Sequence, residues 1–265
     1  MSKSVTGLDA IRILHHDEPV MGTVVTFDLY DDADALSMDL ERALRQSIAV
    51  LHSADEVFST WKVDSPISKL RRGEITEKQC PPEVGVVLDL CRAARTISEG
   101  WFDPWSMPGG VDPTGFVKGW SAQRSLDVLK QSGVCGALVN AAGDTASFGG
   151  PRAGARFRIG IVDPSATQRL AHIVESPGAV ATSGTYERGP HLVDPHSGRP
   201  CSRVASATVT GVDLGLADAL ATALAVAGDQ GLALIEALDD YEALVIGFDG
   251  SSKMTSNFPI APDPA

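Results

Sequence analysis

The sequence predicts one large domain with an α+β, or mixed α/β, fold. Strand-like and helical segments alternate along the 265 residues, the second half is rich in strands, and the G-x-G-x-x-G dinucleotide-binding fingerprint is absent. A parallel doubly wound sheet places a helix between successive strands. The strand-rich second half, with few long helices, therefore favours an α+β or mixed arrangement over that fold.

A strand opens the expected domain, and two helices follow it. In residues 22–30, "GTVVTFDLY", apolar and polar residues alternate, which is typical of a half-buried strand. Apolar residues recur at helical spacing in 35–58 and again in 83–100. The second of these segments ends in Gly100, a residue that suits a helix C-cap.

Residues 100–119, "GWFDPWSMPGGVDPTGFVKG", are crowded with Gly and Pro, so we expect no regular element to run through them. Helices are expected over about 120–131 and over 216–228. The strands expected in the second half are 136–143, 156–164, 177–184, 206–212 and 242–248.

For the domain organisation, we expect an N-terminal extension over residues 1–20, a single domain over 21–250 and a loosely held C-terminal tail over 251–265. The four cysteines are scattered without a C-x-x-C pair, which favours reduced core thiols over disulfides or a zinc site.

The composition indicates a compact globular protein, with 43% hydrophobic and 21% charged residues. The formal net charge of −12 argues against nucleic acid and anionic membrane surfaces as partners, because both are polyanions. No stretch reaches the roughly 18 apolar residues that a membrane span needs, and the first residues lack the apolar core of a signal peptide. We therefore expect a cytoplasmic protein without membrane insertion.

The helical run 216–228, "LADALATALAVAG", is almost wholly apolar but contains one carboxylate and one hydroxyl, Asp218 and Thr222. Side chains four residues apart point the same way on a helix. The simplest interpretation is local: Asp218 caps or pairs nearby, and Thr222 hydrogen-bonds to its own helix.

Two loops contain residues able to do chemistry. The segment "HLVDPHSGRP", residues 191–200, is either a plain hairpin loop or the source of a proton acceptor, His191. Thr182, Ser183 and Gly184 follow a buried strand and form either a plain turn or a close-approach anion site.

Two further segments offer polar groups near strand or helix ends. Asn140, Gly143 and Asp144 resemble a phosphate-binding turn at a strand end. Lys118 lies at an expected helix start, where the helix dipole favours anions rather than a cation. It is either a solvated surface lysine or the partner of a bound phosphate or carboxylate.

Taken in order, eight segments resemble the ApbE family of FAD:protein FMN transferases. They are "MGT", "FSTWKVDSPISKL", "GWFDP", "VDPTGFVKG", "LVNAAGD", "ATSGTYER", "HLVDPHSGRP" and "ADALATAL", and the resemblance runs from about Met21 to Phe248. It implies an ApbE-like fold, in which sheets and helices pack around a central FAD cleft. It also implies Mg²⁺-dependent cleavage of the FAD pyrophosphate, transfer of FMN through a phosphoester bond to a Thr or Ser hydroxyl of a target flavoprotein, and release of AMP.

The resemblance also implies roles for individual residues. Asp218 and Thr222 become side-chain ligands of Mg²⁺, helped by a backbone carbonyl near Gly115, since hard oxygen donors suit this ion. His191 matches the residue that acts on the attacking hydroxyl, so His191 and Asp218 are the expected catalytic residues. The residues expected to bind FAD are Thr60, Trp61, Asp112, Lys118, Asn140, Gly143, Asp144, Ser183 and Gly184.

The chain departs from the family pattern in three places. Gln123 stands where an acid is usual, Ala142 replaces one glycine of a usual pair, and the stretch between "GWFDP" and "VDPTG" is short. These departures leave two alternatives to the transferase: an FAD pyrophosphatase that uses water as acceptor and yields FMN and AMP, or a noncatalytic FAD-binding protein.

Overall fold

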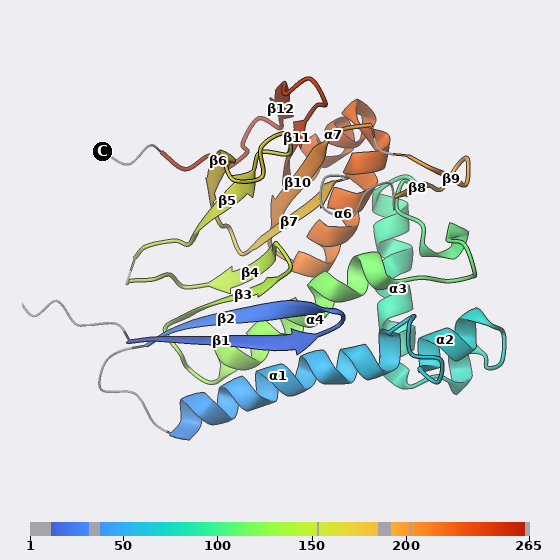
Figure 1. Ribbon diagram of the computed structural model, residues 1–265, viewed down its shortest axis with the longest axis horizontal. Coiled ribbons are helices and arrows are strands. Elements are labelled where there is room, and N and C mark those ends of the chain that lie inside the picture. Colours follow the sequence, from blue (N-terminus) through green and yellow to red (C-terminus); the bar gives the residue numbers. More distant parts are fainter. Residues whose placement is uncertain (1–11, 32–37, 153, 185–191, 202, 263–265) are drawn as a thin grey trace, which may run out of the picture.

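The computed structural model describes residues 12–31, 38–152, 154–184, 192–201 and 203–262. Its centre is an eight-stranded sheet of order β1-β2-β3-β4-β7-β10-β11-β12, in which every neighbouring pair for which a register is described is antiparallel (Figure 1). This topology confirms the α+β prediction. The strands are β1 (Arg12–Val20), β2 (Thr23–Asp31), β3 (Gly136–Ala141), β4 (Asp144–Phe148), β7 (Ala179–Gly184), β10 (Ser206–Gly211), β11 (Glu242–Ile246) and β12 (Ser252–Met254).

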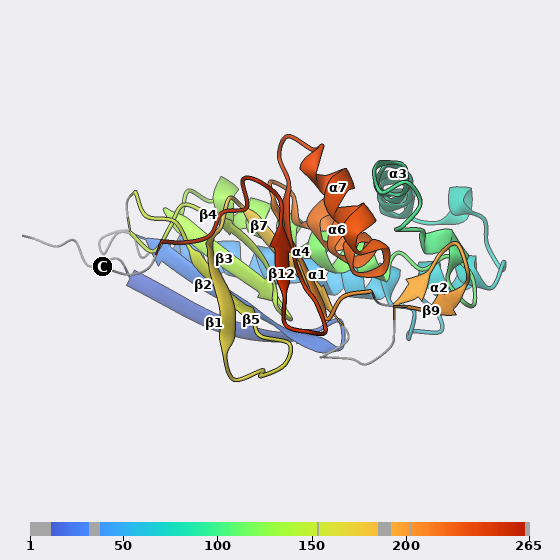
Figure 2. The ribbon, with the colours of Figure 1, turned by 90° about the horizontal axis from the view of Figure 1, so that it is seen from above.

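Helices cover one face of this sheet, and a hairpin packs on the other. The helices α1 (Met38–Phe58), α4 (Thr114–Gln131) and α6 (Leu214–Ala227) share a core with the inward-facing strand residues (Figures 1 and 2). On the opposite face, the hairpin of β5 (Arg158–Val162) and β6 (Leu170–Glu175) shares a smaller core with β7 and β11.

A second layer of helices lies beyond the first. A separate apolar cluster joins the end of α1 to α4, α6, α2 (Pro66–Arg71) and α3 (Pro82–Ile97). Helix α7 (Asp229–Glu236) follows α6 directly and packs on it and on β11. Within the described ranges, no helix is both long and apolar enough to cross a membrane.

Helix α6 is buried on nearly every side, between the sheet and the helices α3 and α4. A helix in such a position needs apolar residues all round, which explains its composition. Asp213 begins the helix by accepting a hydrogen bond from Leu216 N at 2.8 Å. Asp218, only 3% exposed, is the one charged residue among the buried residues described for this helix.

The start of α4 differs from the prediction. The helix begins at Thr114 rather than near residue 120, so the Gly- and Pro-rich segment 100–119 does contain a regular element. Pro113 precedes the first turn, where its missing N–H leaves no hydrogen bond unmade. Gly119 lets α4 approach α6: a Cβ built there would lie 2.3 Å from the carbonyl oxygen of Leu214.

We therefore expect Gly119→Ala to destabilise the protein by about 2–3 kcal/mol, because the added methyl forces α4 away from α6. Gly85→Ala is the matched control, since Gly85 lies inside α3 and a Cβ added there would have no neighbour within 4 Å. That change is expected to stabilise the protein by roughly 0.5–1 kcal/mol. Urea unfolding of both variants checks the pair, and equal effects would contradict the packing role of Gly119.

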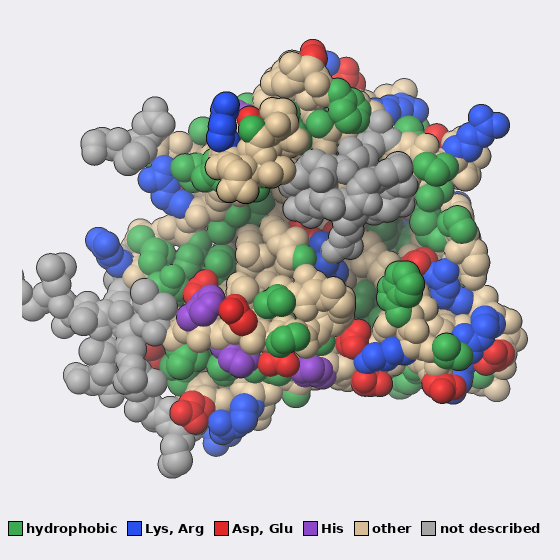
Figure 3. Space-filling view, viewed as in Figure 1, with side chains coloured by type: hydrophobic (Ala, Val, Ile, Leu, Met, Phe, Trp, Pro, Cys, Tyr) green, Lys and Arg blue, Asp and Glu red, His purple; other side chains and the backbone are tan. Residues whose placement is uncertain are grey.

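Strand β1 is an edge of the sheet and was not predicted as a strand. Polar side chains occupy both of its faces: His15 contacts Asp28 at 2.7 Å on one face, and Glu18 contacts His16 at 3.0 Å and His52 at 2.7 Å on the other. These contacts lower the pKa of the Glu18 carboxyl. Figure 3 shows the resulting group of His, Asp and Glu side chains over β1 and α1. Charge along an edge discourages pairing with another chain.

The main sheet extends beyond the expected domain of 21–250. Strand β1 lies wholly within the expected extension and β12 wholly within the expected tail, and both pair with their neighbours in the sheet. Their sequences gave little sign of this, because β1 is mostly polar and β12 has only three residues. The elements α2, β4, β6 and α7 were also not predicted.

Candidate active site

A cavity of about 700 Å³ opens where β7 diverges from β4. Strand β7 pairs with β10 along its whole length but with β4 only at Ala179 and Val180. Beyond that point, Thr182 N donates to the Asp144 Oδ1 carboxylate oxygen at 2.8 Å. The Asp144 side chain thus replaces the backbone hydrogen bonds between β4 and β7 at this point, and the cavity lies beside this side chain.

The structure brings most of the expected site residues to this cavity, although they come from distant parts of the sequence. The expected residues that line it are Thr60, Trp61, Asp112, Gly115, Lys118, Ser183, Gly184, Asp218 and Thr222. Three expected residues, Asn140, Gly143 and Asp144, lie next to it but not in its wall. His191 lies outside the described residues.

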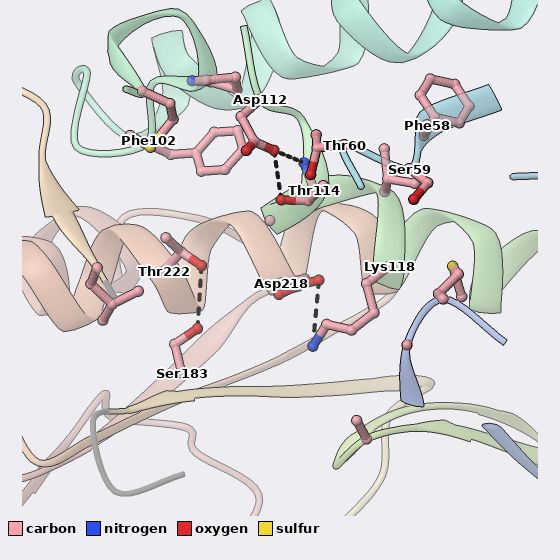
Figure 4. A pocket seen from close by; sticks show the side chains of 18 of the residues that line it. Phe58, Ser59, Thr60, Phe102, Asp112, Thr114, Lys118, Ser183, Asp218 and Thr222 are labelled. Carbon is pink, nitrogen blue, oxygen red and sulfur yellow. Dashed lines mark hydrogen bonds and ion pairs between the residues drawn. The ribbon is translucent and has the colours of Figure 1, made fainter. Parts of the chain in front are cut away.

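Lys118, from α4, reaches two aspartates at the inner end of the cavity, and Figure 4 shows its approach to one of them, Asp218. Its ammonium group contacts Asp144 closely and lies 3.8 Å from Asp218 Oδ2. Both carboxylates are almost completely buried. Lys118 is therefore paired with carboxylates of the protein itself and is not a solvated surface lysine. Its contact with a bound phosphate stays a prediction.

Oxygen donors gather around Thr222, one helical turn from Asp218. Ser183 Oγ lies 3.2 Å from Thr222 Oγ1 across the space between β7 and α6 (Figure 4). The backbone of Gly115 comes close as well, since a Cβ built there would lie 3.8 Å from the same hydroxyl. Asp218 Oδ2 accepts a hydrogen bond from Gly119 N at 3.2 Å, which orients the carboxylate.

This donor set fits Mg²⁺. The described residues contain no group of three His, Cys, Asp or Glu side chains that could hold a metal ion by themselves. Mg²⁺ is commonly bound through one or two carboxylates and keeps its other positions for water and substrate phosphates. One carboxylate with hydroxyl groups beside it therefore matches this ion better than zinc, which prefers three or four nitrogen or sulfur ligands.

Asp112 has a structural role besides its place in the cavity wall. Its carboxylate pairs with Arg71 at 2.6 Å and accepts hydrogen bonds from Thr114 N at 3.1 Å and Thr114 Oγ1 at 2.6 Å. Arg71 also donates to Pro108 O at 3.0 Å. The short stretch between "GWFDP" and "VDPTG" is thus tied to α2 on one side and to the start of α4 on the other.

Asn140, Ala142 and Gly143 build the turn between β3 and β4. Asn140 Oδ1 accepts from Gly143 N at 2.8 Å, and of these three residues only Ala142 lines the cavity. Both central residues have positive φ, +53° at Ala142 and +94° at Gly143, as a tight two-residue hairpin turn requires. The glycine replaced by Ala142 would have suited this conformation.

Ala142→Gly is expected to stabilise the protein by about 0.5–1 kcal/mol, because relief of the left-handed strain exceeds the entropy that glycine adds to the unfolded chain. The same substitution at exposed Ala93 in α3 should destabilise by roughly 1 kcal/mol. Thermal and urea unfolding of both variants give the comparison. A destabilised Ala142→Gly would show that the alanine methyl contributes packing that the strain argument omits.

Residues 192–200 form the hairpin that the turn signals favoured, with β8 (Val193–Asp194) pairing β9 (Arg199–Pro200). Asp194 closes the turn by accepting from His196 N at 2.9 Å and Ser197 Oγ at 3.0 Å. The hairpin is held over the cavity by His196, whose ring packs edge-on against Trp101 with centroids 4.5 Å apart. His191 directly precedes this hairpin in the chain, and the first residue of the hairpin, Leu192, lines the cavity.

Gln123 lies away from the cavity wall. Its side-chain oxygen accepts a hydrogen bond from Leu214 N at 3.3 Å, at the first turn of α6, and its nitrogen donates to Asp127 at 3.3 Å. An N–H in the first turn has no partner within its own helix. The amide oxygen of Gln123 therefore accepts the hydrogen bond that a carboxylate oxygen would accept from Leu214 N. Because Gln123 does not line the cavity, glutamine in place of the usual acid does not change the residues of the cavity wall.

Several cavity residues were not among the expected ligands. Phe102, Trp101 and Asp103 lie in "GWFDP", and Met21 and Thr23 lie in "MGT", two segments that the sequence singled out without assigning residues. The sequence indicated these residues only through the two segments that contain them, because no single side chain had a chemistry that pointed to a ligand.

Comparison with known proteins identifies the fold and the family. Two solved structures have the same fold: the flavin transferase ApbE from Vibrio cholerae, with a TM-score of 0.81 at 24% identity over 94% of this chain and 99% of that one, and the ApbE protein from Thermotoga maritima, with a TM-score of 0.80 at 19% identity over 92% and 97%.

Curated relatives are similar over part of their length. An FAD:protein FMN transferase from Vibrio cholerae is 37% identical over 139 residues, which are 48% of this chain and 42% of that protein. One from Rhodobacter capsulatus is 33% identical over 130 residues, 45% of this chain and 24% of that protein. The match thus spans less than half the length of these relatives. Residues 21–109 and 106–245 match the ApbE family model, and the chain belongs to the ApbE family.

Proposed function

We propose that this protein is a Mg²⁺-dependent FAD:protein FMN transferase, which cleaves the FAD pyrophosphate, attaches FMN through a phosphoester to a Thr or Ser hydroxyl of an acceptor flavoprotein and releases AMP. One observation carries the proposal: Asp218, Thr222 and Ser183 meet beside the Lys118–Asp144 pair at the inner end of a single large cavity. The names of the relatives give further support.

The cavity has two chemically different parts that suit FAD. Its inner end presents the hydroxyl groups of Ser183 and Thr222 together with the Lys118 ammonium, as a phosphate group requires. Toward solvent, Trp61 is 93% exposed and lies in the wall next to Thr60. An exposed indole at the entrance offers a planar surface on which the flavin ring can stack.

Asp218, Thr222 and the carbonyl near Gly115 would hold Mg²⁺, which would neutralise charge on the phosphoryl oxygens during transfer. Lys118 and Ser183 would orient the pyrophosphate. In the reaction, the acceptor hydroxyl oxygen forms a bond to the FMN phosphorus, the bond from that phosphorus to the bridging oxygen breaks, and AMP leaves with that oxygen. His191 would take the proton of the hydroxyl.

The remaining expected ligands have supporting parts in this proposal. Asp144 fixes Lys118 and Thr182, Asn140 and Gly143 shape the turn that presents Ala142, and Gly184 ends β7 at the cavity. Asp112 holds the start of α4, from which Gly115 and Lys118 extend.

The proposal is tested by incubating the protein with FAD and Mg²⁺, with and without a flavin-free candidate acceptor flavoprotein. AMP release and covalent flavin fluorescence on the acceptor are followed together. The transferase predicts AMP release that depends on acceptor and equals the flavin attached. AMP release without acceptor would instead identify a pyrophosphatase, and tight FAD binding without turnover would identify a binding protein.

A further inference from the structure

The Lys118 ammonium is shared unequally between two buried carboxylates. Asp144 and Asp218 have side chains that are 1% and 5% exposed, and the Lys118 side chain is 23% exposed. The contact with Asp144 is close, whereas the distance to Asp218 Oδ2 is 3.8 Å. Lys118 is thus anchored on Asp144. It also lies within ion-pair distance of Asp218, the expected metal ligand (Figure 4).

Each carboxylate is also held by a backbone N–H, so neither depends on Lys118 for its position. Thr182 N donates to Asp144 at 2.8 Å, and Gly119 N donates to Asp218 at 3.2 Å. What Lys118 adds is charge. Two carboxylates buried in one site repel each other, and each is costly to keep ionised without a compensating cation.

We propose that Lys118 is a tethered counter-ion that competes with the divalent cation for Asp218. Without the cation, its charge balances Asp218 as well as Asp144. When the cation binds Asp218, the ammonium is a like charge nearby, so its presence weakens cation binding. Lys118 then stays on Asp144, where its positive charge faces the phosphates of the substrate.

This inference rests on the proposed function, because it takes Asp218 as the metal ligand. It gives Lys118 a different effect from the one a plain phosphate-binding lysine would have. A lysine that acts only on phosphate leaves the affinity of the substrate-free protein for a metal ion unchanged. A competing counter-ion lowers that affinity, and its removal raises it.

The test is Mn²⁺ binding to the full-length protein without FAD, measured by titration calorimetry and by the EPR signal of free Mn²⁺. We expect Lys118→Met to bind Mn²⁺ about tenfold more tightly than the unmodified protein, the size of effect that one charge has on another at this separation. Lys118→Arg, which keeps the charge, should bind no more tightly than the unmodified protein. Lys130→Met, the same change at an exposed position of α4, should leave the affinity unchanged.

Equal or weaker Mn²⁺ binding by Lys118→Met would overturn the inference. If that variant is unstable without metal, its melting temperature should rise more on addition of Mn²⁺ than that of the unmodified protein, and a smaller rise would also overturn it. If both Lys118→Met and Lys118→Gln fail to fold at every Mn²⁺ concentration, the fold requires Lys118 even when the cation is available to balance Asp218. That result contradicts the proposal. Asp218→Ala separates the two claims: Mn²⁺ binding unchanged in that variant removes the metal assignment itself.

Discussion

Asp218→Ala is expected to reduce Mg²⁺-dependent FMN transfer by about a thousandfold or more, while the protein stays folded. The side chain supplies the one carboxylate of the expected metal site, and the stabilisation that such an ion gives to a transferring phosphoryl group is several kcal/mol. The fold should survive because Lys118 keeps its closer partner, Asp144. AMP release and covalent flavin, measured across a range of Mg²⁺ concentrations, give the comparison.

Asp229→Ala is a suitable control for this variant. It removes an exposed carboxylate at the start of α7, paired with Lys253 at 2.7 Å, and should leave transfer unchanged. Thr222→Ser, which keeps the hydroxyl, should retain far more activity than Thr222→Val. Normal activity in Asp218→Ala would show that the metal is bound elsewhere.

His191→Ala is expected to lower FMN transfer by about 10²–10⁴-fold with FAD affinity retained, because general acid–base groups typically contribute this much. His191 lies just before the β8–β9 hairpin, whose residues Leu192 and Val193 line the cavity. Single-turnover transfer to an acceptor and FAD binding by fluorescence quenching measure the two quantities separately.

His172→Ala is the control for the histidine variant. This histidine lies in β6, contacts Ser252 Oγ at 3.3 Å and does not line the cavity, so its loss removes an imidazole without removing the expected base. It should change transfer little. A loss of FAD binding in His191→Ala, with the transfer rate of the bound fraction unchanged, would make His191 a ligand contact and not a proton acceptor.

Periodicity in the sequence was enough to locate the elements that form the core. The alternation in 22–30 and the apolar run in 216–228 correspond to β2 and α6, because burial on one face or on all sides determines which residues such elements can contain. The start of α4 could not be found in this way. Gly119 in this helix is required by the close approach of α6, a tertiary contact that local propensity does not record.

The site shows a similar division. Four-residue spacing indicated that Asp218 and Thr222 share a helix face, but only the fold shows that Ser183 and Gly115 lie across from them. The sequence also gave no sign that Lys118 pairs with Asp144, which is 26 residues away and on a strand. Such pairings depend on how α4, β4 and α6 pack together, and no local pattern encodes them.

The most direct test of this account is a crystal structure of the protein with FAD and Mn²⁺ bound, with the ion located by its anomalous scattering. We predict that the ion lies at coordination distance from the side-chain oxygens of Asp218 and Thr222, with the FAD pyrophosphate beside it in the cavity and the flavin ring toward Trp61. An ion bound away from Asp218, or FAD bound outside this cavity, would contradict the account.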